Sequence, residues 1–342
     1  MDFNNYEFYN VITDIDYQTA SEFLDKYYFQ GDDINFKLHY STDHIKWLVS
    51  VSEENHDHLC FALVFKGTKI FVGFIMGTVV QFSHNNEYIN MTEVNLLCIH
   101  PKLRQKNYGL YVINEFVRRV KLIGHSEAIY TGVNKLSWPN VYIGTVNYYH
   151  RPLDLEYLIN LDFTSVEPYK NIDAKKKALR LPNESKFLKE LSEDKLSEAY
   201  KLFSNYIRKF KLYPIMSEEM FRKTFYNNNY VKCYLCIQDD IIKDIVSYYV
   251  MPFKHIETGK VVKSAMLYYY TNYNNNLYDW IKNLMINLVN DGYQLLNALN
   301  IMENDDILSS LKFEEGTGVL HYLIYKHKVD AIKANEIGKI LF

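Results

Sequence analysis

The first half of the chain alternates between continuous apolar runs and one amphipathic stretch. The runs at 59–65 and 69–82, separated by a turn sequence at Gly67, predict a β-hairpin. A third run, at 88–100, is apolar enough for a strand that is buried on both faces. The stretch 112–120 has apolar residues at helical spacing and charged residues on the opposite face. A strand followed by such a helix predicts an α/β unit.

The second half repeats this order of apolar runs and amphipathic stretches. The stretches 195–210 and 277–291 have helical spacing, and Gly292 follows the second of them. The strand-like runs of this half lie at 234–238, 244–251, 263–273, 293–299 and 319–327. The Lys-rich residues 165–187 are expected to form a linker or a crossing strand. The repeated order of strands and helices predicts a duplicated domain of the α/β (α+β) class.

Composition and charge narrow the class of protein. The chain has 342 residues, of which 48% are hydrophobic and 23% are charged, as expected for about two globular domains. The net charge of -3 argues against a dedicated nucleic-acid-binding protein. Four cysteines are too few for a disulfide framework. Neither a signal peptide nor an apolar run of transmembrane length is apparent, so we expect a cytoplasmic monomer without stable membrane insertion.

The segment Arg104–Gly109, with the sequence RQKNYG, carries the clearest local chemistry. It lies between a predicted strand and a predicted helix, where backbone N–H groups can bind a phosphate group. Arg104 and Lys106 add positive charge, and Gly109 allows a ligand to approach the backbone. Asn107 tolerates a positive φ. An ordinary basic turn has the same features, although the pattern resembles the acyl-CoA loop of the GNAT acetyltransferase fold.

Longer segments carry a more specific resemblance. The stretch EVNLLCIHPKLRQKNYGLYVINEFVRRVKLIGHSEAIYTGV strongly resembles the central signature of N-myristoyltransferases. The stretch GTVNYYHRPLD resembles the second signature of that family. Further blocks match in order, namely KLYPIMSEEMF, LNALNIMEN, LKFEEGTGVLHYLIYKHK and the final ANEIGKILF. The resemblance covers nearly the whole chain from about Tyr6.

The resemblance implies a fold and a reaction. The fold would be two tandem GNAT-like halves around a saddle-shaped mixed sheet, with residues 1–165 binding acyl-CoA and residues 166–342 contributing to peptide binding. The reaction would transfer myristate from myristoyl-CoA, as a co-substrate, to the α-amino group of an N-terminal glycine. No metal or permanently bound cofactor is implied. The partners would be myristoyl-CoA and proteins that begin with glycine.

The resemblance also assigns roles to residues. The backbone N–H groups of Leu96 and Leu97 would form an oxyanion hole, and the C-terminal carboxylate of Phe342 would act as the general base. Asn95 and Thr131 would hold the incoming amine. The acyl-CoA site would comprise Leu97, Cys98, Ile99, Arg104, Gln105, Lys106, Asn107, Tyr108 and Gly109. The peptide site would comprise Asp32, Asp33, Tyr40, Tyr148, His150, Gly316, Thr317 and Gly318.

The chain departs from the family pattern at several positions. Gln105, Asn107 and Leu110 replace serine, arginine and proline, which removes one positive charge from the CoA loop. An aromatic-rich segment that precedes the first helix in the family has no counterpart, so one wall of the CoA site would be missing or replaced. These departures keep two alternatives open. The chain would then use another acyl chain or a lysine acceptor on the same fold, or it would bind N-terminal glycine or acyl groups without catalysis.

The cysteines do not predict a metal site, a redox site or a nucleophile. Cys233 and Cys236 form a Cys-x-x-Cys pair within a predicted strand, which would direct the two thiols to opposite faces. We therefore expect no metal or redox role for them. Cys98 follows the predicted oxyanion residues, and the resemblance implies that it contacts acyl-CoA without forming a covalent intermediate.

Overall fold

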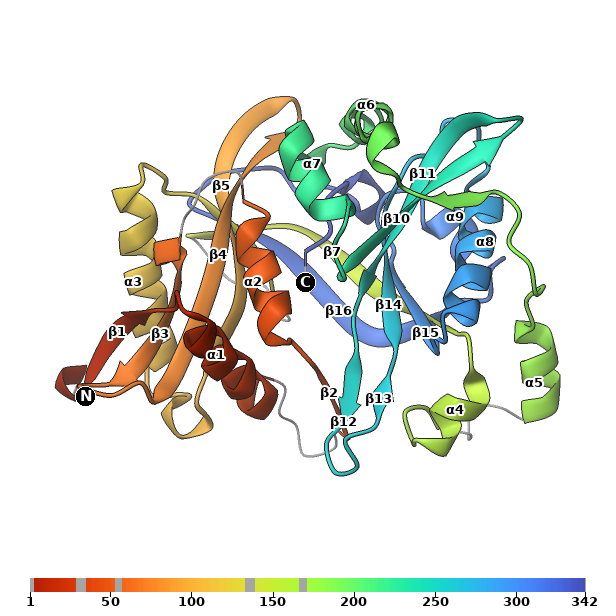
Figure 1. The fold of residues 1–342 in the computed structure, drawn as a ribbon. Coiled ribbons are helices and arrows are strands. Elements are labelled where there is room, and N and C mark those ends of the chain that lie inside the picture. Colours follow the sequence, from red (N-terminus) through yellow and green to blue (C-terminus); the bar gives the residue numbers. More distant parts are fainter. Residues whose placement is uncertain (1–2, 29–34, 53–56, 133–138, 166–170, 342) are drawn as a thin grey trace.

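A computed structural model of the chain describes residues 3–28, 35–52, 57–132, 139–165 and 171–341 (Figure 1). The helices are α1 (Asp14–Tyr27), α2 (Thr42–Ser50), α3 (Tyr108–Leu122), α4 (Leu155–Asn160), α5 (Ile172–Leu179), α6 (Leu196–Tyr206), α7 (Glu218–Phe225), α8 (Leu277–Asn290) and α9 (Asp305–Leu308). The strands of the first half are β1 (Tyr6–Asn10), β2 (Phe36–Leu38), β3 (Cys60–Phe65), β4 (Phe71–His84), β5 (Glu87–Ile99), β6 (Ala128–Gly132) and β7 (Asn140–Pro152). Those of the second half are β8 (Leu188–Glu190), β9 (Leu212–Ile215), β10 (Val231–Gln238), β11 (Ile241–Val250), β12 (Phe253–His255), β13 (Val261–Val262), β14 (Ser264–Tyr270), β15 (Leu295–Leu299) and β16 (Glu314–Tyr325).

One mixed sheet of 13 strands runs through the molecule, in the order β1-β3-β4-β5-β6-β16-β7-β15-β14-β11-β10-β8, with β9 paired to β4. The pairs β5–β6 and β14–β15 are parallel, and helices α3 and α8 make the respective crossovers. The last strand of each half pairs with strands of the other half. Strand β7 pairs with β15, whereas β16 pairs with β6 and β7. This arrangement confirms the predicted mixed fold built from two similar halves.

Helices cover both faces of the sheet in the first half. Helix α3 packs on one face, where Val112, Phe116 and Val120 are buried against β3 and β4. Helices α1 and α2 lie on the opposite face, and α2 stands between β4 and the second half in Figure 1. The predicted hairpin is confirmed as β3–β4, with Gly67 at a φ of +74° in its turn. The strand–loop–helix unit around β5 and α3 is also confirmed.

One expectation needs correction, and three further segments form elements that were not predicted. Residues 172–179, expected as linker or crossing strand, form helix α5, because Ala and Lys favour helix and the Asn171 side chain caps Ala174 N. Residues 140–145, for which no strand was predicted, belong to β7. Glycine is suited to position 144 because the strand passes close to residue 332: a Cβ at 144 would lie only 3.0 Å from the Ile332 carbonyl oxygen. Helices α2 and α7 were not predicted, since each has only two turns and starts at a single serine cap.

Candidate functional site

Strand β5 contains a bulge at Leu96 and Leu97. Its register with β4 passes from Asn95–Met76 directly to Cys98–Phe74, so two residues of β5 face one of β4. Leu96 has a φ of +53°, a left-handed conformation that costs about 1–2 kcal/mol for a residue with a side chain. A bulge turns its peptide groups out of the regular ladder. Both predicted oxyanion residues therefore lie at an irregular, strained point of an otherwise regular strand.

The neighbouring strand diverges from β5 next to this bulge. Within the part of the chain that the structure describes, β5 and β6 pair only at Thr92–Ala128 and Glu93–Ile129. Further along β6, Thr131 pairs with Tyr322 of β16. Leu97 is 37% exposed, whereas Leu96 is only 4% exposed. The bulge thus has one buried residue and one residue at an opening between two strands.

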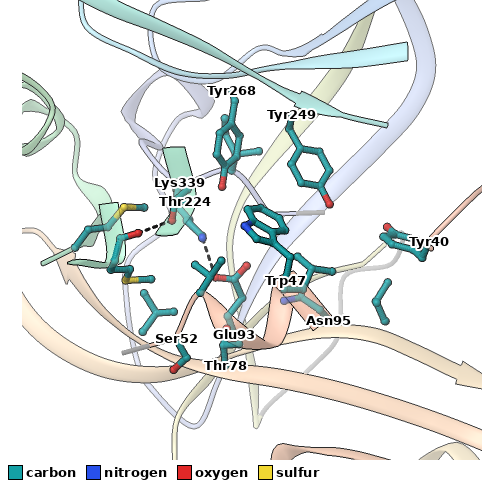
Figure 2. Close-up of a pocket in the computed structure, with 17 residues that line it drawn as sticks. Tyr40, Trp47, Ser52, Thr78, Glu93, Asn95, Thr224, Tyr249, Tyr268 and Lys339 are labelled. Carbon is teal, nitrogen blue, oxygen red and sulfur yellow. Dashed lines mark hydrogen bonds and ion pairs between the residues drawn. The ribbon is translucent and has the colours of Figure 1, made fainter. Parts of the chain in front are cut away.

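A cavity lies beside Leu96 and Asn95 (Figure 2). Its walls come from α2, β4, β5, α7, β11, β14 and the C-terminal segment. The lining residues are Tyr40, Trp47, Leu48, Val51, Ser52, Thr78, Val80, Glu93, Asn95, Leu96, Met216, Met220, Thr224, Tyr249, Tyr268, Lys339 and Ile340. The structure thereby brings Tyr40, Asn95 and Leu96, three residues predicted from sequence, to one cavity.

A buried ion pair lines the same cavity. Nζ of Lys339 lies 2.7 Å from Oε2 of Glu93, and the two side chains are 7% and 12% exposed. Burial disfavours the charged ammonium, but the Glu93 carboxylate outweighs this effect and the pKa of Lys339 is raised above its ordinary value. Sequence reasoning missed both residues. The available signal was a lysine within the apolar C-terminal tail.

Two buried tyrosine hydroxyls hold that tail. The Tyr322 hydroxyl donates to the carbonyl oxygen of Lys339 at 2.9 Å and accepts from the Leu341 N–H at 3.2 Å. The Tyr269 hydroxyl accepts from the Ile340 N–H at 3.4 Å. Burial raises the pKa of both tyrosines, so both remain protonated. The tail thus ends in the middle of the molecule (Figure 1), while Phe342 itself lies outside the described residues.

The predicted peptide residues on β7 and β16 are also in contact. The rings of Tyr148 and His150 are parallel, with centroids 6.3 Å apart, and His150 Nδ1 lies 2.6 Å from Asn297 Oδ1. A Cβ on Gly316 would lie 2.3 Å from His150 Nε2, and one on Gly318 would lie 2.8 Å from the Tyr148 ring. These glycines therefore let β16 cross closely over two side chains of β7. Thr317 between them is exposed.

Tyrosine side chains connect this group to the cavity. The pKa of Tyr40 lies well above its ordinary value, mainly because the side chain is buried. The neighbouring phenols of Tyr28, Tyr249 and Tyr148 raise it further. Burial likewise raises the pKa of Tyr148 to about 12. Tyr40 and Tyr148 thus belong to one cluster of protonated phenols. The predicted acidic residues Asp32 and Asp33 lie outside the described residues.

In the basic loop, Arg104 is hydrogen-bonded to the protein backbone, whereas the next three residues are exposed. Arg104 is structural in this conformation, since its Nε donates to the Ile99 carbonyl at 2.9 Å and its guanidinium also donates to the Tyr27 carbonyl. Gln105, Lys106 and Asn107 are exposed. Gln105 and Asn107 have φ values of +58° and +59°, and Asn107 caps α3 without a side-chain hydrogen bond. The predicted tolerance of Asn107 for positive φ is confirmed.

The start of α3 leaves room for a ligand. A Cβ on Gly109 would meet only Ile99 Cγ1, at an ordinary 3.8 Å, so the protein's own packing does not require glycine there. Tyr108 is buried, and its ring packs edge-on against Phe3 and Tyr6. The open N-terminus of α3 and the exposed loop before it form a surface suited to an anion.

The cysteines are buried thiols. Burial raises the pKa of Cys98 to about 12, although Arg104 opposes the shift. Cys98 is therefore protonated and poorly nucleophilic at neutral pH. Cys233 and Cys236 are both buried in β10, and burial raises the pKa of each. In the described part of the chain, no three His, Cys, Asp or Glu residues gather in a way that could hold a metal ion.

Comparison with solved structures first identifies the general fold. GCN5-related N-acetyltransferases from Anabaena variabilis and Kribbella flavida have the same general fold, with TM-scores of 0.55 and 0.53 at 7% and 9% sequence identity. The matches cover 93% and 95% of this chain and 72% of each of those chains. This chain thus shares its general fold with two GCN5-related N-acetyltransferases.

More specific comparisons then give the family. The pattern of the myristoyl-CoA:protein N-myristoyltransferase N-terminal domain matches residues 2–141, and that of the C-terminal domain matches residues 160–339. The chain therefore belongs to the N-myristoyltransferase family of acyltransferases. The structure of Saccharomyces cerevisiae N-myristoyltransferase with bound myristoyl-CoA matches with a TM-score of 0.93 at 22% identity, over 100% of this chain and 86% of that one.

Curated relatives agree with this assignment. A glycylpeptide N-tetradecanoyltransferase of Drosophila melanogaster is 28% identical over 324 residues, which is 93% of this chain and 68% of the relative. The enzyme of the same name from Plasmodium falciparum is 27% identical over 319 residues, or 92% of this chain and 77% of the relative. Among the residues described, no helix combines the length and apolar character that a membrane crossing needs.

Proposed function

We propose that the chain transfers a myristoyl group from myristoyl-CoA to the α-amino group of an N-terminal glycine. The observation that carries this proposal is the bulge at Leu96–Leu97, beside both a cavity and an opening between β5 and β6. The amine attacks the thioester carbon, a C–N bond forms and the C–S bond breaks. CoA leaves as a thiolate and is protonated to the thiol with a proton released from the amine.

The oxyanion of the tetrahedral intermediate needs fixed hydrogen-bond donors. Backbone N–H groups at a bulge serve this purpose well, because they are held by the strand and do not reorganise during the reaction. We assign this role to the N–H groups of Leu96 and Leu97. The positive φ of Leu96 supports the assignment, since a strained backbone conformation in a strand is retained where it serves a site.

The acyl donor would occupy two surfaces that meet at the bulge. Its pyrophosphate would bind at the N-terminus of α3, where Lys106 supplies charge and Gly109 leaves the backbone open. Its acyl chain would enter the cavity beside Leu96, whose apolar walls include Trp47 and Met220. Burial of apolar surface contributes about 25 cal/mol per Å² to binding a chain of this kind.

The amine must lose a proton before it attacks. An α-amino group has a pKa near 8, and a terminal carboxylate in water has a pKa of about 3.5. We propose that the carboxylate of Phe342 holds the ammonium and accepts its proton. The hydrogen bonds from Tyr322 and Tyr269 to the preceding residues support this role, because they fix the path of the tail. Glu93 is already engaged by Lys339, which leaves the terminal carboxylate for the substrate.

The peptide would lie between the two halves, residues 1–165 and 166–342. Asn95 and Thr131 would hydrogen-bond the glycine amine, and Tyr40, Tyr148 and His150 would line the path of the following residues. The crossing of Gly316, Thr317 and Gly318 over β7 supports a narrow groove at this point. Asp32 and Asp33 would attract a basic residue of the substrate.

Mass spectrometry of a peptide tests the proposal directly. The purified protein, with a free C-terminus, is incubated with myristoyl-CoA and an octapeptide that begins with glycine. We expect a mass gain of one myristoyl group on the α-amine, and no gain on a matched peptide that begins with N-acetylglycine. Failure to modify any of several glycine peptides would refute the transferase assignment and favour a binding role or another acceptor.

A further inference from the structure

The ion pair between Glu93 and Lys339 joins the two segments that carry the proposed chemistry. Glu93 lies in β5, three residues before the bulge at Leu96. Lys339 lies in the C-terminal tail, three residues before Phe342. Nζ of Lys339 is 2.7 Å from Oε2 of Glu93, and Figure 2 shows the two side chains pointing toward one another. The pair is thus a direct link between the strand with the proposed oxyanion groups and the segment that ends in the terminal carboxylate.

Each partner of this link has a fixed backbone. Glu93 pairs with Thr78 of β4 and with Ile129 of β6, so its strand is held on both sides. The Lys339 carbonyl accepts a hydrogen bond from the Tyr322 hydroxyl of β16 at 2.9 Å. That bond ties the tail to the second half, whereas the ion pair ties it to β5 of the first half.

Stability alone does not account for two charges at this place. The Glu93 and Lys339 side chains are 12% and 7% exposed. Removing ions from water is costly, and well-packed apolar residues of similar volume often stabilise a fold equally well. Apolar residues tolerate small shifts against each other, whereas an ammonium and a carboxylate in contact fix both a distance and a direction. A buried ion pair is therefore better suited than an apolar contact to specify where the tail lies along β5.

Glu93 and Lys339 are the two charged residues that line the cavity, among those that the structure describes. The titratable groups that act on the pair are phenols, namely Tyr249, Tyr268, Tyr269 and Tyr322. Burial raises the pKa of each phenol, so all four are protonated and uncharged. Loss of one partner would therefore leave the other charge buried without compensation.

We propose that Glu93 and Lys339 are positioning residues of the transfer reaction, and that their ion pair holds the terminal carboxylate at a fixed place relative to the oxyanion bulge of β5. This inference rests on the proposed function, because it takes Phe342 to carry the general base. Neither side chain accepts the proton or contacts the reacting atoms. Each acts through its own segment, Glu93 through β5 and Lys339 through the tail.

The link acts over a short length of chain. Three residues span at most about 10 Å, so a shift at Lys339 also moves the carboxylate that follows it. Reacting atoms must lie about 3–3.5 Å apart, and a misplacement of about 1 Å can lower a rate by about a hundredfold. Loss of the ion pair should therefore slow the chemical step.

Two double variants test the link. The neutral variant Glu93→Leu/Lys339→Met removes both charges at similar volume, so we expect thermal stability to be unchanged or higher. Its single-turnover rate, measured with saturating myristoyl-CoA and glycine peptide, should fall by at least about tenfold. The charge-reversed variant Glu93→Lys/Lys339→Glu restores an ion pair and should regain most of that rate. A contact that served packing alone would give the opposite order of rates.

Two controls separate this effect from misfolding and from loss of charge in general. The Kd for CoA, measured by calorimetry, should be unchanged in both variants, because the proposed pyrophosphate site lies at the start of α3. The control Glu156→Gln/Lys176→Met removes an exposed ion pair with an N–O distance of 2.8 Å and should keep the wild-type rate.

A single variant serves as a second test if the neutral variant does not fold. Glu93→Asp keeps the negative charge but shortens the side chain by one methylene group. The ammonium and the carboxylate then meet only if the tail shifts toward β5. We expect a slower single turnover with an unchanged Kd for CoA.

The outcomes separate this inference from the proposed function. If the wild-type protein transfers no myristoyl group to any glycine peptide, the proposed function fails. If the wild type transfers the group and the folded neutral variant keeps its rate, only the present inference fails. A charge-reversed variant no faster than the neutral one, or a folded Glu93→Asp variant with the wild-type rate, also overturns it.

Discussion

The hydroxyl of Tyr322 bonds to the backbone of Leu341 and thereby ties the C-terminal tail to strand β16. The same hydroxyl donates to the carbonyl of Lys339, so one side chain fixes the backbone on both sides of Ile340. Tyr322 is fully buried, and its ring is held by its position in β16 between β6 and β7. The direction in which the chain leaves Leu341 is therefore set by a rigid part of the sheet.

Replacing Tyr322 tests how much this bond contributes. Tyr322→Phe leaves a buried carbonyl and a buried N–H without partners, so we expect the free energy of unfolding to fall by about 1–3 kcal/mol. We also expect kcat to fall by about tenfold, because the tail is no longer fixed, while the Kd for acyl-CoA changes little. Denaturant unfolding, steady-state kinetics and calorimetry measure the three quantities. Tyr325→Phe, at the far end of β16, is the control, and an equal loss of kcat there would contradict the assignment.

Leu96 provides a test of the bulge. A β-branched residue is strongly disfavoured at positive φ, so Leu96→Ile, which keeps the side-chain volume, should destabilise the protein by about 1–2 kcal/mol. Turnover should fall further than stability alone explains, because the N–H groups of Leu96 and Leu97 would be displaced. Single-turnover kinetics and thermal unfolding measure these effects. The same change at the neighbouring Leu97 is the control for stability, and we expect it to leave the free energy of unfolding nearly unchanged because Leu97 lacks a positive φ.

A substitution at Gly109 should affect folding and ligand binding in opposite directions. Gly109→Ala adds a methyl group that meets only Ile99 at 3.8 Å, in the first turn of a helix. We expect the free energy of unfolding to rise by up to about 1 kcal/mol, since alanine favours helix more than glycine does. The Kd for acyl-CoA should increase because the methyl group stands where the ligand approaches. Calorimetry that finds unchanged acyl-CoA affinity in the stabilised variant would argue against a ligand at this point.

The buried His44 should make the stability of the protein depend on pH. Burial lowers the pKa of His44 from 6.5 to about 3, and its Nε2 lies 2.5 Å from the Tyr249 hydroxyl. Between pH 6.5 and about 3, the unfolded chain binds a proton that the folded chain does not bind. The free energy of unfolding should therefore fall by about 1.4 kcal/mol per pH unit as the pH decreases through this window. Above the window, the contribution of the neutral His44 to stability is fully present.

The variant His44→Gln isolates this contribution. Its stability should depend less on pH between 6.5 and about 3 than that of the wild type. Denaturant unfolding at a series of pH values gives the difference. His125→Gln, at a half-buried loop position, is the comparison, and equal slopes in wild type and His44→Gln would show that His44 does not govern the dependence.

The elements around the site could be read from the sequence because each has a local signature. The run that forms β5, the loop that precedes α3 and the apolar face of α3 all follow simple spacing rules. Asn107 was identified by its tolerance of positive φ and Gly67 as part of a turn, and both have a positive φ. Helix α5 could have been identified from Asn171 and the alanine and lysine residues that follow it.

The remaining features depend on contacts between distant parts of the chain. A pair of leucines in an apolar strand gives no sign of a bulge, because leucine rarely adopts positive φ. Glu93 and Lys339 are 246 residues apart in the sequence (339 − 93), and only the pairing of strands between the halves brings them together. The burial of the Ser52 hydroxyl, which has no hydrogen bond among the residues that the structure describes, is likewise a property of the folded chain and not of its neighbours in sequence.

The pairing of the last strands between the halves also sets an order of assembly during synthesis. Strand β16 inserts between β6 and β7, which emerge from the ribosome long before it. Until β16 is made, β6 lacks its neighbour on that side and the sheet is interrupted between β6 and β7. Contacts between such distant segments form slowly, because a long loop must close first. In a nascent chain, the gap between β6 and β7 therefore stays open until β16 has been made, and the segment bearing Lys339 is made after β16.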